Sequence, residues 1–223
     1  MLDQGLINKY RNKEIPAQKL FIDGNWVNGS GADFDIISPI DGKPFTSIAR
    51  ATVGDMNKAI KSARDAFEKG SWSNMPPAQR KKILHNLSDL IERDAIELTV
   101  LGVRDNGTEI NMAINAEAGS AAGTFRYYAE SIDKVYGEIA PTANSVLGLI
   151  HKEPVGVVGT IVPWNFPLMI GAWKIAPALA AGNSIVLKPA ETASLSLLKL
   201  AELAAEAGVP EGVLNVVTGQ GSL

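Results

Sequence analysis

The sequence has 223 residues, of which 46% are hydrophobic and 20% are charged, and its formal net charge is −3 at pH 7. This composition is typical of a folded, soluble protein, and because it contains no run of Lys and Arg, it offers no electrostatic footprint for nucleic acid. Cysteine is absent, which excludes disulfides, thiolate metal sites and a cysteine nucleophile within these residues.

The first part of the chain predicts short strands followed by helices. Asp23-Gly24 is a strong signal for a two-residue hairpin turn between strands at 19–22 and 25–27. Two further short strands are expected at 34–37 and 45–49. Apolar residues at intervals of three and four predict helices at about 56–67, 83–91, 94–104 and 111–135, with Gly70 ending the first and Gly137 the last.

The pattern changes after an extended segment at 145–151. The near-continuous apolar run 155–162 is typical of a strand buried on both faces of a parallel sheet. A helix at 167–181, kinked at Pro177, then alternates with strands at 184–187 and 213–217 and a helix at 194–207. This order predicts an α/β fold, in which an incomplete, Rossmann-like doubly wound parallel sheet follows N-terminal helices and short antiparallel strands.

One stretch has the composition of a membrane span, because Lys174 is the only charged residue between Glu153 and Lys188. Glycines and prolines interrupt it, and a buried strand followed by a buried helix accounts for the same composition. We therefore expect no membrane segment. The first twenty residues contain no apolar signal segment, and the lack of cysteine agrees with a reducing compartment, so we expect a cytoplasmic protein.

Three loops follow the predicted parallel strands, at 163–166, 188–191 and 218–221. The carboxyl ends of parallel strands share one edge of the sheet, where ligands bind. At the second loop, the Glu191 carboxylate could accept hydrogen bonds from a ribose and repel a 2′-phosphate, and Lys188 could donate to the same ribose. A solvated lysine and a helix-capping glutamate fit the same positions, and position alone does not decide between the two interpretations.

Asn165 is the second candidate for a chemical role. It lies between Trp164 and Phe166, with a proline on either side of the group, so its amide could be held stiffly in a dry pocket and stabilise an oxyanion. An asparagine that satisfies loop backbone groups is the commoner case. Ile170 and Trp173 could line an apolar channel, although apolar residues at helical spacing usually belong to the core.

Residues 153–191, EPVGVVGTIVPWNFPLMIGAWKIAPALAAGNSIVLKPAE, resemble the aldehyde dehydrogenase superfamily. The resemblance extends through LFIDGNWV, SPIDGKPF, RYYAESIDKVYGEIAP and EAGVPEGVLNVVTG. RYYAESIDKVYGE and the KPAE loop look most similar to the gamma-glutamyl-gamma-aminobutyraldehyde dehydrogenases of putrescine breakdown.

The resemblance implies NAD-dependent oxidation of a small aldehyde to a carboxylic acid through a cysteine thiohemiacetal and thioester. NADP is possible but less favoured. Asn165 matches the oxyanion donor, and Lys174 matches a lysine that organises the catalytic centre. Phe166, Ile170 and Trp173 match positions near the substrate. The cofactor contacts would be Ile161, Val162, Pro163, Trp164, Asn165, Lys188, Pro189, Ala190, Glu191 and Gly219.

By the same resemblance, residues 1–135 and 152–223 are a C-terminally incomplete NAD-binding domain, and 136–151 are part of an oligomerisation arm. We expect the catalytic domain, with its glutamate and cysteine, to be absent. This chain alone should then be inactive, and it should be poorly soluble or associate. The complete enzyme should be a homodimer or homotetramer. A non-catalytic nucleotide-binding module and an inactive truncated relic are the alternatives.

The sequence departs from the family pattern at 105–109, where Thr108-Glu109 stands in place of a usual Lys-Pro. We interpret this segment as a surface turn that affects no predicted site residue.

Overall fold

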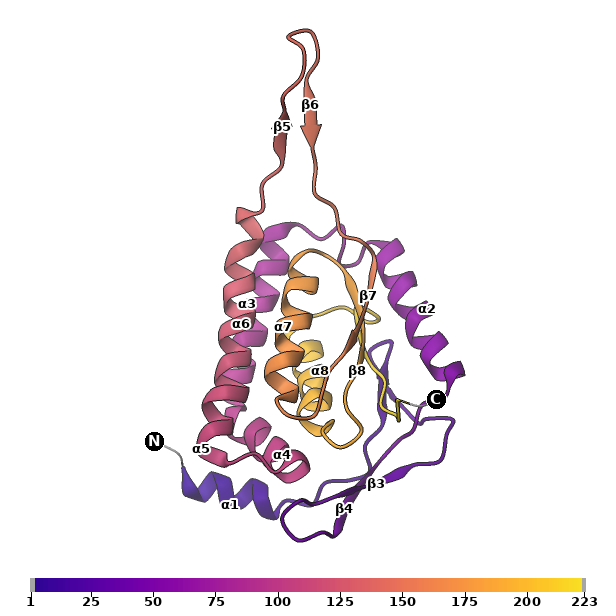
Figure 1. Ribbon diagram of the computed structural model, residues 1–223, viewed down its shortest axis with the longest axis vertical. Coiled ribbons are helices and arrows are strands. Elements are labelled where there is room, and N and C mark those ends of the chain that lie inside the picture. The colour runs from indigo at the N-terminus through magenta and orange to yellow at the C-terminus, as the bar shows by residue number, and fades with distance from the viewer. Residues whose placement is uncertain (1–2, 222–223) are drawn as a thin grey trace.

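The computed structural model describes residues 3–221 (Figure 1). A five-stranded sheet in the order β2-β1-β9-β8-β7 organises the structure. Its strands are β1 (Leu20–Ile22), β2 (Asn25–Val27), β7 (Val157–Ile161), β8 (Ser184–Lys188) and β9 (Leu214–Val216). β7, β8 and β9 are parallel, whereas β1 pairs antiparallel with both β2 and β9. The predicted α/β fold is confirmed, and the N-terminal hairpin extends the sheet on the β9 side.

The hairpin forms because its turn residues adopt a conformation that most side chains avoid. Asp23 has φ of 54° and Gly24 has φ of 73°, as a two-residue turn between twisted antiparallel strands requires. The Asp23 carboxylate also accepts a hydrogen bond from the Ser62 hydroxyl at 2.8 Å. The hairpin predicted from Asp23-Gly24 is therefore confirmed.

Helices surround the sheet, and their bounds are α1 (Gln4–Asn12), α2 (Val53–Lys69), α3 (Pro77–Arg93), α4 (Ala95–Asn106), α5 (Ile110–Ala113), α6 (Ser120–Ser131), α7 (Pro167–Ala180) and α8 (Leu195–Ala207). A π-helix, η1 (Ile114–Gly119), joins α5 to α6, and a 3₁₀ turn, η2 (Ile132–Lys134), follows α6. The helix expected at 111–135 is therefore four consecutive segments, α5, η1, α6 and η2, and it ends before Gly137. None of the helices within residues 3–221 combines the length and apolar character that crossing a bilayer requires.

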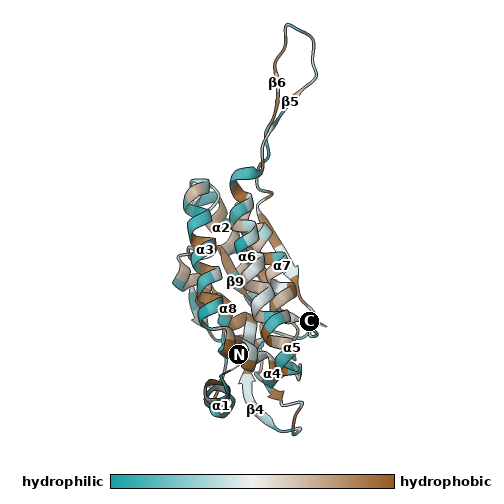
Figure 2. Ribbon diagram, turned by 90° about the vertical axis from the view of Figure 1, so that its left-hand side faces the viewer, coloured by the Kyte–Doolittle hydropathy of each residue, from teal (hydrophilic) through white to brown (hydrophobic). Residues whose placement is uncertain are grey.

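The sheet separates two hydrophobic cores. Along β8, Ile185 and Leu187 belong to the larger core, under α7 and α8, whereas Val186 belongs to the smaller core, under α2. α3, α4 and α6 pack outside α7 and α8 as a further layer. Figure 1 shows these layers side by side, and Figure 2, which faces the outer layer, shows hydrophilic residues on α3 and α6. α7 and α8 lie between the sheet and a second helical layer. Contacts on both sides of these helices therefore help to hold the loops that precede them.

One prediction about β7 was wrong. Its apolar run suggested a strand buried on both faces, but Val155 is 83% exposed and Ile161 is 78% exposed. The reason is topological, because β7 is the edge strand and no strand within residues 3–221 pairs with its outer side. An apolar run predicts that both faces of a strand are buried, but it does not identify the segments that bury them.

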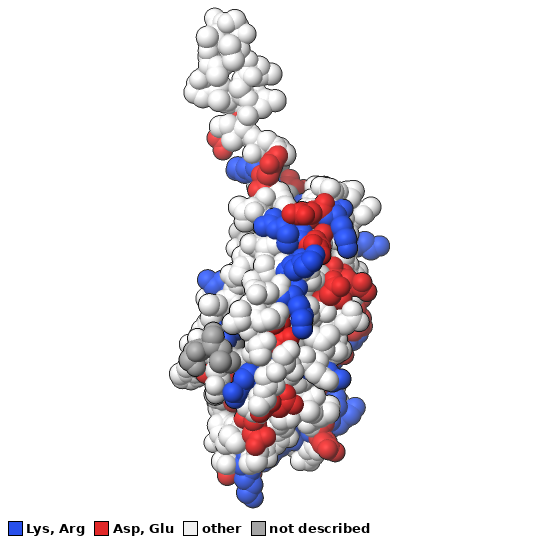
Figure 3. Space-filling model, turned by 90° about the vertical axis from the view of Figure 1, so that its right-hand side faces the viewer, with Lys and Arg blue, Asp and Glu red and all other residues white. Residues whose placement is uncertain are grey.

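Two small antiparallel ribbons lie outside the main sheet. β3 (Phe34–Ile37) pairs with β4 (Pro44–Ile48) beside α1, and β5 (Glu138–Ala140) pairs with β6 (Gly148–Ile150) in an arm that projects from the body (Figure 1). The arm includes the extended segment expected at 145–151. Its outer part carries no Lys, Arg, Asp or Glu (Figure 3).

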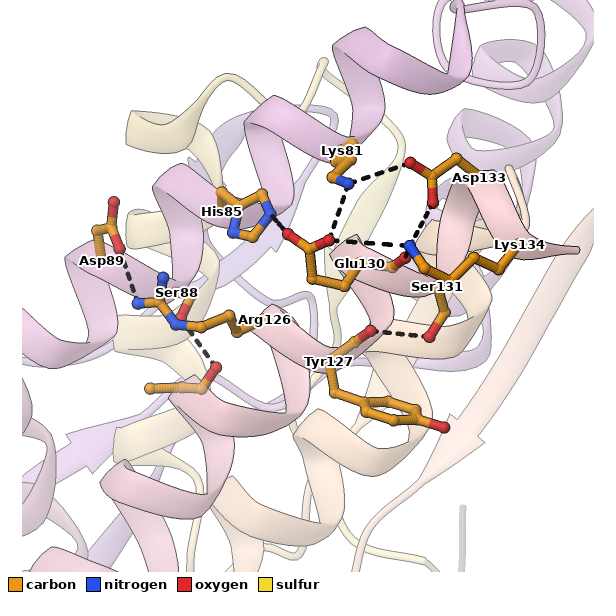
Figure 4. A network of polar contacts seen from close by, with 11 residues as sticks. Lys81, His85, Ser88, Asp89, Arg126, Tyr127, Glu130, Ser131, Asp133 and Lys134 are labelled. Carbon is orange, nitrogen blue, oxygen red and sulfur yellow. Dashed lines mark hydrogen bonds and ion pairs between the residues drawn. The ribbon is translucent and has the colours of Figure 1, made fainter.

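Charged side chains fasten α6 to α3 on the surface (Figure 4). Nζ of Lys81 donates to Glu130 at 2.9 Å and to Asp133 at 3.1 Å, and Nε2 of His85 lies 2.7 Å from Oε1 of Glu130. About half of the Glu130 side chain is exposed, so solvent screens these pairs and each contributes little to stability.

Candidate functional site

The carboxyl ends of β7, β8 and β9 lie side by side. Val162 N donates to Lys188 O at 3.1 Å, and Val217 N donates to Leu187 O at 2.8 Å, so the pairing continues past the ends of the strands. The loops 163–166, 188–191 and 218–221 therefore leave the sheet at one edge, as the sequence predicted. This edge is the candidate site.

The first loop is open to solvent. Trp164 is 62% exposed, and Asn165 is also exposed. Nδ2 of Asn106, at the end of α4, donates to Trp164 O at 3.4 Å and tethers the backbone. The stiff, dry pocket considered for the Asn165 amide is not formed by residues 3–221, because Asn165 is exposed there and no described strand pairs with the outer side of β7.

The residues around this loop divide into buried and exposed groups. Ile161 and Pro163 are exposed, whereas Val162 is buried. On α7, Trp173 and Lys174 are exposed and Ile170 is half-buried, as is Phe166, the residue just before the helix. Ile170 also packs against the larger core. The candidate substrate residues Phe166, Ile170 and Trp173 thus remain partly or largely exposed among the described residues, and Ile170 also contributes to the core.

Lys188 and Glu191 form an ion pair at the end of β8. Nζ of Lys188 lies 3.7 Å from Oε2 of Glu191, and it donates to Pro189 O at 3.0 Å. The Glu191 side chain is 43% exposed, so its carboxylate is open to a ligand. Pro189 is buried and Ala190 is half-buried, which holds this short loop against the body.

The third loop is fixed through its backbone. The Thr218 hydroxyl donates to Ala49 O at 2.6 Å, and Ala51 N donates to Thr218 O at 2.9 Å. Gly219 is buried, but a Cβ added there would lie 3.7 Å from the Ala51 backbone, an ordinary contact. The protein itself therefore does not require a glycine at this position, which leaves close approach of a ligand as one reason for it.

Two buried carboxyl groups near the site were missed by sequence reasoning. Oε2 of Glu117, in η1, accepts a hydrogen bond from Met169 N at 2.9 Å, and Oδ2 of Asp105 accepts one from Leu195 N at 2.8 Å. Burial raises the pKa of both groups. Asp105 is 4% exposed, so the segment at 105–109 is not simply a surface turn. The acidic Glu117 within the small, apolar tract AINAEAGSAA was the available signal.

Other features do not add to the site. A cleft of about 250 Å³ lies between α1, α4 and α8, and it includes none of the predicted site residues. Its charged groups pair with one another, as Lys13 with Glu97 at 2.8 Å and Lys199 with Glu202 at 3.0 Å. Over residues 3–221, no cluster of His, Asp and Glu is arranged to hold a metal ion.

Comparison with known proteins gives a consistent result. The sequence profile of the aldehyde dehydrogenase family matches residues 26–223. The NADP/NAD-dependent aldehyde dehydrogenase PuuC of Escherichia coli (strain K12) is 48% identical over 204 residues, which are 91% of this chain and 41% of PuuC. The aminoacetaldehyde dehydrogenase of Pseudomonas aeruginosa is 43% identical over 205 residues, 92% of this chain and 41% of that enzyme.

Solved structures show the same similarity. Indole-3-acetaldehyde dehydrogenase complexed with NAD⁺ has a TM-score of 0.95 and 42% identity, covering 100% of this chain and 45% of that one. The gamma-glutamyl-gamma-aminobutyraldehyde dehydrogenase of Burkholderia cenocepacia J2315 has a TM-score of 0.94 and 43% identity, covering 97% and 44%. The chain thus spans about two fifths of the length of the curated relatives above. It belongs to the aldehyde dehydrogenase family.

Proposed function

We propose that this chain is the NAD-binding part of an enzyme that oxidises an aldehyde to a carboxylic acid. The observation that carries the proposal is the gathering of three loops at the carboxyl edge of the parallel sheet, with the Lys188–Glu191 pair at the end of β8. This is the edge at which doubly wound sheets bind dinucleotides. The NAD⁺ complexes of similar proteins support the same reading.

The residues present at this edge suit a dinucleotide. The half-exposed Glu191 carboxylate would accept hydrogen bonds from the adenosine ribose, and Lys188 would donate to it. Ile161, Val162, Pro163 and Trp164 would line the cofactor from β7, and Pro189, Ala190 and Gly219 would line it from the other two loops. Because Glu191 would repel a 2′-phosphate, NAD is favoured over NADP, although PuuC is named for both.

The chemistry would be completed outside these residues. The amide of Asn165 would donate to an oxyanion on the substrate, Lys174 would organise the centre, and Phe166, Ile170 and Trp173 would face the aldehyde. The 223 residues contain no cysteine, so a thiolate nucleophile must come from elsewhere and this chain alone is expected not to turn over. The similarity to the gamma-glutamyl-gamma-aminobutyraldehyde dehydrogenase of Burkholderia cenocepacia favours an aldehyde of that kind as the substrate. The lack of cysteine agrees with a reducing compartment, so we propose a cytoplasmic location.

Calorimetric titration of the purified chain with NAD and NADP tests the cofactor site. We expect Glu191→Gln to weaken NAD binding about tenfold, because a charged hydrogen-bond acceptor is lost. The same change should reduce the preference for NAD over NADP. Glu211→Gln is the matched control, since it removes the same charge before β9, at the opposite edge of the sheet. An unchanged preference would reject the ribose role of Glu191.

Two results would contradict the proposal itself. If the unmodified chain takes up no NAD, the edge is not a working cofactor site, and an inactive relic becomes the better description. If the purified chain forms NADH when an aldehyde is added, the nucleophile does not come from outside it.

We also propose that residues 136–151 form an arm for homo-oligomerisation, apart from a cofactor domain made by 1–135 and 152–223. Ile139, Leu147 and Leu149 are each 71–72% exposed, and exposed apolar residues on a projecting ribbon favour pairing with another chain. The joint change Leu147→Ser and Leu149→Ser should increase the monomer fraction in light scattering. Val53→Ser, at an exposed apolar position on α2, is the control and should leave that fraction unchanged.

A further inference from the structure

We infer that Glu117 and Asp105 are positioning residues that hold the first turns of α7 and α8, and thereby the two loops in front of them. The inference rests on the proposed function, because these loops carry Asn165 and Glu191. Both carboxyl groups come from the helical layer outside α7 and α8, far from the loops in sequence. We call these two contacts, from Glu117 to the start of α7 and from Asp105 to the start of α8, the clamp.

The beginning of α7 lacks a cap of its own. Its N-cap residue, Phe166, makes no side-chain cap, and Pro167 has no N–H to donate. The next N–H groups belong to Leu168 and Met169, and Oε2 of Glu117 accepts from Met169 N at 2.9 Å. A residue some fifty positions earlier therefore replaces the missing cap, directly behind Asn165.

The beginning of α8 repeats the arrangement. The Ser194 hydroxyl makes no side-chain cap on its own helix and instead donates backwards to Ala190 O at 2.7 Å. Asp105 supplies the acceptor instead, with Oδ2 2.8 Å from Leu195 N. The hydroxyl bond to Ala190 links this turn to the loop that contains Glu191.

The next residue after Asp105 reaches the other loop. Asn106 donates to Trp164 O, so two consecutive residues at the end of α4 hold the β8 loop and the β7 loop. The wide turn of η1 brings Glu117 to the same region, beside Asn106 and Leu168. Residues 105–117 thus hold the loops 163–166 and 188–191 relative to each other.

Helix stability alone is a poor explanation for these two groups. An exposed Ser, Thr or Asp at the N-cap caps a helix without burying a carboxyl group. Here both groups are buried, and Oδ1 of Asp105 and Oε1 of Glu117 lack a hydrogen-bond partner among the described residues, which costs free energy. The two buried hydrogen bonds instead fix the distance between the outer helical layer and each of the two loops.

Hydrogen exchange measured by mass spectrometry on the full chain tests the clamp in a crossed design. We expect Glu117→Leu to speed exchange about tenfold in 163–170 and to leave 188–198 unchanged. Asp105→Leu should speed exchange about tenfold in 188–198 and leave 163–170 unchanged. Glu117→Gln and Asp105→Asn keep an acceptor oxygen and should restore exchange close to that of the parent chain. Leu84→Ala, a core change in α3, is the control for general loosening and should affect both segments.

The outcomes separate the clamp from simple destabilisation. If each leucine variant speeds exchange equally in both segments, as Leu84→Ala does, the inference is overturned. If a leucine variant fails to fold, Glu117→Asp serves instead, because it keeps the charge but is too short to reach α7, and it should loosen 163–170 alone. Normal exchange in that variant would also overturn the inference.

NAD titration of the same variants links the clamp to the site. The leucine variants should bind NAD several-fold more weakly than the amide variants. If exchange follows the crossed pattern but NAD affinity is unchanged, the two groups do not position the cofactor loops. If the parent chain binds no NAD, the proposed function fails, while the exchange pattern still decides whether the clamp exists.

Discussion

Replacing Trp72 by alanine is expected to lower the free energy of unfolding by about 4 kcal/mol, the usual cost of removing a buried aromatic side chain. Trp72 is fully buried in the larger core. Its indole N–H donates to Leu179 O at 2.9 Å, in the last turn of α7. The change would leave a cavity and also release the far end of the helix that begins behind Asn165.

Urea denaturation followed by circular dichroism measures this loss. Trp72→Phe should cost clearly less, because it keeps most of the apolar contact and Leu179 O still accepts from Gly182 N. Trp26→Ala is the control, since Trp26 is 40% exposed and its loss should cost much less. Equal losses at positions 26 and 72 would show that Trp72 does not have the central packing role assigned to it.

Replacing Asp55 by alanine is expected to cost about 3 kcal/mol at neutral pH, because one buried carboxylate satisfies several donors. Asp55 is 2% exposed. It accepts from the backbone and hydroxyl groups of Ser30 at 2.9 Å and of Thr52 at 3.0 Å, and from Nζ of Lys58 at 3.1 Å. It therefore joins the start of α2 to the loop after β2.

The loss should depend on pH in a defined direction. Burial alone would raise the pKa of Asp55, but the hydrogen bonds from Thr52 and Ser30 outweigh it and hold this pKa well below its usual value of 3.8. A lowered folded-state pKa gives stability that is complete above pH 3.8 and is lost as the pH falls towards the folded value.

Melting temperatures of the parent chain and Asp55→Asn, compared from pH 7 down to pH 3, check this sign. The difference between them should be constant at neutral pH and should shrink as the pH falls below about 4. Asp33→Asn removes an exposed carboxylate and should change little at any pH. A difference that grows on acidification would contradict the role given to Asp55.

The sequence allowed much of the fold to be predicted wherever a local signal had a local cause. Asp23-Gly24 gave the hairpin because only a tight turn uses its backbone angles. Alternating apolar strands and helices after residue 151 gave the parallel order. The 4–12 helix was missed because α1 is polar and buries only Ile7. Edge exposure of β7 could not be foreseen, since strand order is not encoded in a single apolar run.

The position of the three candidate loops was also predictable from the sequence. The three loops were found because parallel strands must place their carboxyl ends together. The surroundings of Asn165 could not be deduced, because its exposure depends on what covers the outer side of β7. Glu117 and Asp105 were missed because their partners, Met169 and Leu195, are distant in sequence. Such contacts between separate elements leave no local pattern to read.

The π-helix η1 affects how related sequences should be aligned. A residue added to a regular helix turns everything beyond it by about 100°, and a π turn contains such an addition within a continuous helical segment. A relative with one residue fewer between Ile114 and Gly119 would keep a helix here but would direct a different side chain towards α7. A one-residue gap in this stretch is therefore a change of contact, whereas the same gap in a loop would be a harmless difference in length.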